Sequence, residues 1–141
     1  NIPFAFLPAL MFVLAGITAF STGTSWGTFG IMLPIAADMA MGSHTGMMLP
    51  MLASVLAGAV FGDHCSPISD TTILSSTGAS CHHIDHVVTQ LPYALIAAFI
   101  SLVGYVALGF TESVVAGLVA CSVAFVISII VLKIKSKGAI S

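Results

Sequence analysis

Two aspartates within apolar sequence, Asp63 and Asp70, have the clearest capacity for chemistry. A carboxylate in a hydrophobic segment is costly unless it binds an ion, pairs with a cation or takes a proton. No Lys or Arg is near either one in the sequence, so we expect a proton or a mobile cation to neutralise them. Competition between the proton and the cation for one carboxylate is the simplest physical basis for cation/proton antiport. The alternative is that both aspartates only cap helices beside an ordinary wet loop.

Hydroxyl side chains surround these carboxylates in the sequence and recur in an earlier polar stretch. Small alkali cations prefer hard oxygen ligands, which hydroxyl, carboxylate and carbonyl groups supply. The alternative for any single hydroxyl is structural, because membrane helices use Ser and Thr to satisfy freed backbone groups or to bridge neighbours. The candidate cation ligands are Asp63, Ser66, Ser69, Asp70 and Thr71, with Ser21, Thr22, Thr24 and Ser25 from the earlier stretch.

The composition indicates that membrane-spanning helices position these residues. Of 141 residues, 58% are hydrophobic and 6% are charged, whereas a soluble domain carries about a quarter charged residues. A crossing takes ~20 mostly apolar residues, so we predict an all-α, polytopic membrane protein with four crossing-sized units. The net charge of −2 and the lack of a basic stripe argue against nucleic acid as a partner. No catalytic or nucleotide-binding motif appears in a credible context, which argues against an enzyme.

Both polar stretches are predicted to interrupt helices. The first polar stretch, residues 21–28, is rich in hydroxyls and glycine and separates apolar residues 3–20 from residues 29–41, a run too short for a full span. The second polar stretch, residues 62–70, contains Pro67, which removes a backbone donor and disfavours helix before it. An interruption at membrane depth is tolerated only where it is buried in protein or lines a cavity. We therefore predict two broken or re-entrant helices.

The remaining sequence predicts a half-helix over residues 71–80, a wet interfacial turn over 82–86 and two ordinary spans over 87–110 and 114–132. All three lysines follow the last span. By the positive-inside tendency, residues 133–141 form a cytoplasmic tail.

An apolar motif, Leu-Pro-x-Leu-x-x-Val-Leu-Ala-Gly, occurs at residues 7–16 and again at 49–58. Duplication and chance similarity both stay open, although internal repeats are common in secondary transporters. If the copies run parallel, an even number of crossings separates them, in conflict with one broken span over residues 3–41. Near the second copy, a small-xxx-small row is predicted to pack closely on another helix: Ser54, Gly58 and Gly62.

Histidines and cysteines gather at residues 64–65 and 81–86, but their spacing matches no strong zinc signature. A polar turn is the preferred interpretation, and no transition metal is expected. The three cysteines are odd in number, and Cys121 lies within an apolar run. A disulfide framework is therefore not expected.

The run from Gly62 to Thr72, G-D-H-C-S-P-I-S-D-T-T, resembles the G-D-x-x-S-P-[IL]-S-D-T-T signature of the NhaC family of sodium/proton antiporters. Residues 20–35 and 86–94 are also similar to the C-terminal half of that family. The resemblance implies a secondary transporter of the cytoplasmic membrane, with inverted repeats and broken helices, that exchanges Na⁺ for H⁺ and needs no cofactor. On that basis the cation site would include Asp63, Ser66, Ser69, Asp70 and Thr71.

Members of that family are much longer, so the resemblance implies that residues 1–141 are one transmembrane fragment whose N-terminal half is missing. The start at Asn1, directly before apolar sequence, fits that expectation. The expected partners are the lipid bilayer, the missing half and small ions, with homo-oligomerisation left open. Family members resembling malate/lactate exchangers make an organic-anion antiporter the first alternative, although the chain has no Arg for a carboxylate clamp. The second alternative is a non-transporting membrane module.

Overall fold

A computed structural model describes residues 3–43 and 45–138, and all regular elements in these ranges are helical. Residues 1–2, 44 and 139–141 lie outside the described residues, and with them Asn1 and the end of the predicted tail. The fold is all-α, as predicted. The elements are η1 (Phe4–Phe6), α1 (Leu7–Thr22), α2 (Ser25–Ser43), η2 (Thr45–Met47), α3 (Met48–Cys65), α4 (Asp70–Gly78), α5 (His83–Thr111) and α6 (Val114–Gly138).

Four helical segments in the described part of the chain are long and apolar enough to cross a membrane. They confirm a polytopic membrane protein, since each exceeds or approaches the ~20 residues that a crossing takes. α2 is not among them, although it has 19 residues. The four segments are Phe4–Thr22, Met48–Cys65, His83–Thr111 and Val114–Ile134.

The most extensive helix packing among the described residues is between α1 and α3. A Cβ atom on Gly58 would overlap the carbonyl oxygen of Phe12, and one on Gly62 would overlap the carbonyl oxygen of Gly16. The predicted small-residue row is thus confirmed, because its glycines let the α1 backbone approach α3 directly. Buried side chains from α1, α2 and α3 complete the core around this crossing, among them Met11, Ala15, Met32, Met51 and Val55.

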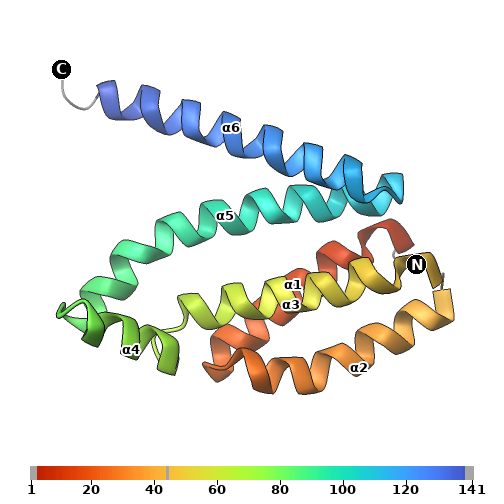
Figure 1. The fold of residues 1–141 in the computed structure, drawn as a ribbon, viewed down its shortest axis with the longest axis horizontal. Coiled ribbons are helices and arrows are strands. Elements are labelled where there is room, and N and C mark those ends of the chain that lie inside the picture. The colour runs from red at the N-terminus through yellow and green to blue at the C-terminus, as the bar shows by residue number, and fades with distance from the viewer. Residues whose placement is uncertain (1–2, 44, 139–141) are drawn as a thin grey trace.

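The first polar stretch connects two helices that reverse direction, rather than interrupting one crossing. Figure 1 shows α1 and α2 running in opposite senses, with α3 returning in the same general sense as α1. The prediction of one broken span over residues 3–41 was therefore wrong. With α2 as the return segment, the two copies of the Leu-Pro motif lie in parallel helices.

The predicted interruption over residues 21–28 was also too wide, because only Gly23 and Thr24 are non-helical there. The hydroxyls do not break the helices. Instead they donate to carbonyls one turn earlier, from Ser21 to Ile17 (2.8 Å) and from Thr28 to Thr24 (3.0 Å). Such bonds satisfy the hydroxyl within the helix. The helices therefore extend through most of this stretch.

α1 ends at Gly23, which has the left-handed φ of +70° and donates its N–H to the Ala19 carbonyl (2.8 Å). A residue in the left-handed conformation after a helix is usually glycine, because the Cβ of any other residue is sterically disfavoured there. Space also requires glycine, since an added Cβ would press on Ile68 from the second polar stretch. The two polar stretches are thus in direct contact.

α3 ends at Cys65, and α4 begins at Asp70 after four non-helical residues that include Pro67. Ser69 caps α4 by accepting a hydrogen bond from the Thr71 N–H (3.2 Å). α4 lies beyond the end of α3, beside the start of α5 (Figure 1). The predicted turn over residues 82–86 was wrong except at His82, because α5 already begins at His83.

α5 and α6 form a hairpin that closes at Glu112 and Ser113. Glu112 ends α5 in the left-handed conformation, with φ of +51°. α6 continues to Gly138, so the first six residues of the predicted tail are helical. Most of the α6 surface in the described residues is exposed, in contrast to the buried faces of α1 and α3.

Candidate cation site

The buried carboxylate of Asp63 is the centre of the candidate site. It lies in the last turn of α3 with 7% of its surface exposed. Its two oxygens accept hydrogen bonds from two buried hydroxyls, Ser25 Oγ at 3.3 Å and Ser69 Oγ at 2.5 Å. The chain's three lysines, Lys133, Lys135 and Lys137, all belong to the last turns of α6. Among the side chains that the structure describes, no Lys or Arg pairs with Asp63.

Ser25 and Ser69 reach Asp63 because they occupy helix starts on either side of it. Ser25 is the first residue of α2, and Ser69 is the N-cap of α4. Close packing of α1 on α3 brings the start of α2 against the end of α3, and the four-residue connection after Cys65 turns Ser69 back. Three helix termini thus converge on one carboxylate.

Ser66 stabilises this convergence from the side of α1. Its buried hydroxyl donates to the Phe20 carbonyl (2.8 Å), one of the last carbonyls of α1. These carbonyls have no partner within their own helix, so a side-chain donor satisfies them. The bond ties the second polar stretch to the end of α1, next to Gly23.

Asp70 and Thr71 lie outside the buried cluster, and both side chains are exposed. Asp70 accepts a hydrogen bond from the Thr71 N–H (2.8 Å), at the start of α4, where a negative charge is favourable. Thr71 Oγ1 is 2.7 Å from Ser69 Oγ. Thr71 therefore links Asp70, through Ser69, to the cluster around Asp63.

The other hydroxyls predicted from the first polar stretch do not contact Asp63 in this arrangement. Ser21 and Thr22 are exposed and donate to carbonyls of α1. Thr24 is half-buried, and its hydroxyl accepts from the Gly27 N–H (3.5 Å). Of the four, Ser25 alone meets the carboxylate.

Two side chains of α5 that were not predicted to belong to the cation site also contact the second polar stretch. His83 Nε2 is 2.7 Å from the Pro67 carbonyl oxygen, and Gln90 Nε2 donates to the His64 carbonyl (2.7 Å). The one available signal was that Gln90 is a polar residue within a predicted span, because such residues usually have a specific partner.

Oxygen atoms of this kind can hold a small cation or a proton. The carboxylate supplies two oxygens, and Ser25 and Ser69 supply neutral ones beside them. Hard monovalent and divalent cations bind such all-oxygen sets, and broken or terminating helices supply them in transporters. A proton on Asp63 would remove the same charge.

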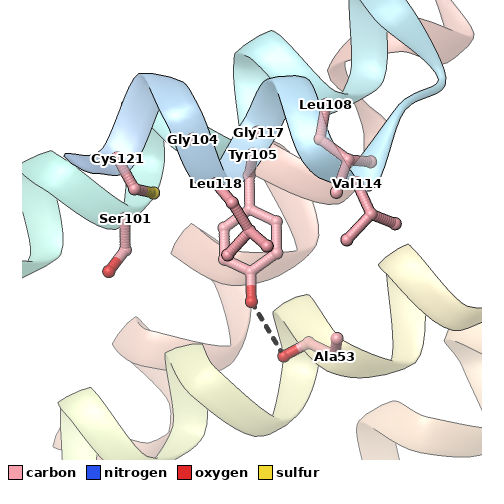
Figure 2. A pocket seen from close by; sticks show the side chains of 9 residues that line it. All are labelled: Ala53, Ser101, Gly104, Tyr105, Leu108, Val114, Gly117, Leu118 and Cys121. Carbon is pink, nitrogen blue, oxygen red and sulfur yellow. Dashed lines mark hydrogen bonds between the residues drawn. The ribbon is translucent and has the colours of Figure 1, made fainter. Parts of the chain in front are cut away.

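A separate cavity of about 280 Å³ lies between α3, α5 and α6 and contains none of these residues. Figure 2 shows its largely apolar lining and Tyr105, whose hydroxyl donates to the Ala53 carbonyl of α3 (3.1 Å). An apolar lining with one hydrogen bond suits helix packing better than ion binding. The lining residues are Ala53, Ser101, Gly104, Tyr105, Leu108, Val114, Gly117, Leu118 and Cys121.

Comparison with known proteins places this sequence among antiporters. A family model described as the Na⁺/H⁺ antiporter family matches residues 1–110. An uncharacterised Haemophilus influenzae protein is 60% identical over 94% of the chain. The malate-2H⁺/Na⁺-lactate antiporter of Bacillus subtilis is 37% identical over 77% of the chain, and the arginine/ornithine antiporter of Halobacterium salinarum is 39% identical over 76%.

The matched segment covers 26%, 23% and 22% of these three relatives, so the chain spans about a quarter of their length. No solved structure matches the chain.

Proposed function

The chain belongs to the Na⁺/H⁺ antiporter family, and from that premise we propose that the full-length protein exchanges Na⁺ for H⁺ across the cell membrane through Asp63. The observation that carries this proposal is the buried carboxylate with two hydroxyl partners and no Lys or Arg partner among the described side chains. The family and the four apolar helices support a multi-pass transporter, as opposed to an enzyme, as the class of the full-length protein.

Electrostatics explains why such a site would exchange its two ligands. An unpaired buried carboxylate is costly, whereas the protonated and the sodium-bound forms are both neutral overall. If the site can change the side of the membrane to which it opens only when it is neutral, it must hold either Na⁺ or H⁺ on every passage. The two ions are then exchanged for one another. In the sodium-bound form, the Ser25 and Ser69 hydroxyls would rotate so that their oxygen lone pairs face the ion.

The remaining predicted ligands have roles other than direct binding in this proposal. Ser66 holds the second polar stretch against α1, while Asp70 and Thr71 form the exposed approach to Asp63. Ser21, Thr22 and Thr24 stay candidates for a second conformation, in which the end of α1 moves relative to α3. The lysine-bearing end of α6 lies in the cytoplasm by the positive-inside tendency.

Exchange of an organic ion is the second candidate, favoured by the similarity to a malate/lactate antiporter and to an arginine/ornithine antiporter. A carboxylate substrate would need its bidentate Arg partner from outside this chain, which has no Arg. Na⁺ and H⁺ would then be coupling ions at the same carboxylate.

Transport by the full-length protein in proteoliposomes tests these alternatives. An imposed sodium gradient is expected to drive proton movement, read with a trapped pH-sensitive dye, without any organic solute. A requirement for malate, lactate, arginine or ornithine would favour the second candidate. Liposomes that show neither sodium-driven nor solute-driven proton movement would reject the transport proposal in favour of a non-transporting module.

Ser25→Ala and Ser69→Asn are each expected to raise the sodium concentration for half-maximal exchange by about ten- to hundredfold. A hydrogen-bonding partner of a charged group contributes about 1.5–3 kcal/mol, and ~1.4 kcal/mol corresponds to a factor of ten. Asn at position 69 keeps a side chain that can cap α4. Ser75→Ala is the matched control, because Ser75 is exposed and donates to the Thr71 carbonyl within α4. Sodium titrations equal to the control for both variants would remove these hydroxyls from the site.

A further inference from the structure

One face of α5 donates side-chain hydrogen bonds to three backbone carbonyls of α3 and of the connection after it. His83 contacts the Pro67 carbonyl, Gln90 the His64 carbonyl and Tyr105 the Ala53 carbonyl. Residues 83, 90 and 105 are spaced by close to whole helical turns, so they share that face. Tyr105 lies at the remote end of the row, beside the apolar cavity (Figure 2).

The two carbonyls near Asp63 need these donors because the helix has ended. In an unbroken helix the His64 carbonyl would accept from the N–H of residue 68. Here the Ile68 N–H contacts the Ser66 hydroxyl instead (3.4 Å). The His64 carbonyl takes Gln90 and, at 3.3 Å, the Thr72 hydroxyl. The side chain of α5 thus replaces the missing helical bond.

His83 fixes the middle of the same connection. A carbonyl can only accept, so Nε2 of His83 carries the hydrogen and donates to Pro67. Its other ring nitrogen is 3.3 Å from the Ser76 hydroxyl of α4. One half-buried imidazole therefore joins α5, α4 and the connection that carries Ser66 and Ser69.

We propose that His83 and Gln90 are positioning residues, through which α5 holds the second polar stretch in the shape that brings Ser69 and Ser25 onto Asp63. This inference rests on the proposed cation site. In this arrangement the His64 and Pro67 carbonyls already accept hydrogen bonds from α5. The cation is therefore held by side-chain oxygens and not by these two carbonyls. A displacement of α5 along α3 would pull on both carbonyls and open the site, which couples this helix to ion release.

Sodium titrations of exchange by the full-length protein in proteoliposomes test the inference. Gln90→Met keeps the length of the side chain but removes the donor, and His83→Leu does the same for the imidazole. Each is expected to raise the half-maximal sodium concentration about five- to tenfold, with a smaller change in maximal rate per folded protein. His83→Gln, which keeps a donor of similar reach, is expected to stay within twofold of the unmodified protein.

Tyr105→Phe is the control for a purely structural role, since it removes the third donor of the same face far from Asp63. It is expected to lower thermal stability in detergent without changing the half-maximal sodium concentration. Unchanged half-maximal sodium in Gln90→Met would overturn the positioning role even if His83→Leu failed to fold. Asp63→Asn, measured alongside, separates the two claims: if it abolishes exchange while Gln90→Met matches the unmodified protein, the inference fails and the proposed function stands.

Discussion

Asp63→Asn is expected to lower sodium-driven proton movement by roughly hundredfold or more, to the level of protein-free liposomes. Asn keeps the size of the side chain and can still meet the hydroxyls of Ser25 and Ser69. It can neither carry the exchanged proton nor neutralise a sodium ion in a buried position. The variant should therefore fold and lose exchange, which is the signature of a residue that carries the ligands.

Two matched variants make the Asp63 result specific. Asp38→Asn makes the same chemical change on the exposed surface of α2 and is expected to leave exchange intact. Asp70→Asn is expected to weaken exchange several-fold by removing the exposed carboxylate at the approach, without abolishing it. Sodium-dependent proton movement that survives in Asp63→Asn at the level of Asp38→Asn would contradict the assignment of the site to Asp63.

The membrane-spanning helices were predictable because apolar length is a local property of the sequence. The two long spans at residues 87–110 and 114–132 correspond to α5 and to most of α6. Pro67 likewise marked the end of α3, because proline lacks the backbone N–H that a helix needs and this effect does not depend on the rest of the fold. The sequence also predicted hydroxyls of both polar stretches around Asp63 and Asp70, and in the structure Ser25 and Ser69 contact Asp63 while Asp70 is exposed.

The reversal at Gly23 was not predictable from local pattern. A hydroxyl-rich segment can interrupt a helix, or its side chains can donate to carbonyls one turn earlier in a continuous helix. Ser21 and Thr28 do the second. The end of α1 at Gly23 depends instead on a distant contact, because Ile68 of the second polar stretch leaves no room for a Cβ there. The contacts of Gln90 and His83 were not predicted for a related reason, because their partners are backbone carbonyls, which every residue has.

The crossing of α1 and α3 links stability to the site. Gly58 and Gly62 face the carbonyls of Phe12 and Gly16, and Asp63 directly follows the second glycine. Any separation of the two helices at Gly62 moves Asp63 away from Ser25, which belongs to the helix that follows α1. The geometry of the candidate cation site therefore depends on a contact made by glycines, which carry no side chain.

Gly62→Ala is expected to destabilise the full-length protein by about 1–3 kcal/mol, the usual cost of adding a methyl group where packing is tight. The new Cβ would overlap the Gly16 carbonyl and approach the Phe20 nitrogen, and both belong to backbone that cannot rotate away. Thermal unfolding in detergent measures the loss, and the double variant with Gly58→Ala should lose more than either alone.

Gly30→Ala is the matched control for Gly62→Ala, because nothing lies within 4 Å of its added Cβ on the exposed side of α2. Alanine is favoured over glycine inside a helix by about 1 kcal/mol, so this control should be as stable as the unmodified protein or more so. The fraction of Gly62→Ala that folds should also need more sodium for half-maximal exchange, since Asp63 is displaced from Ser25. Equal unfolding temperatures for the two variants would show that α1 and α3 do not cross at Gly62, and the approach of the two polar stretches would then need another cause.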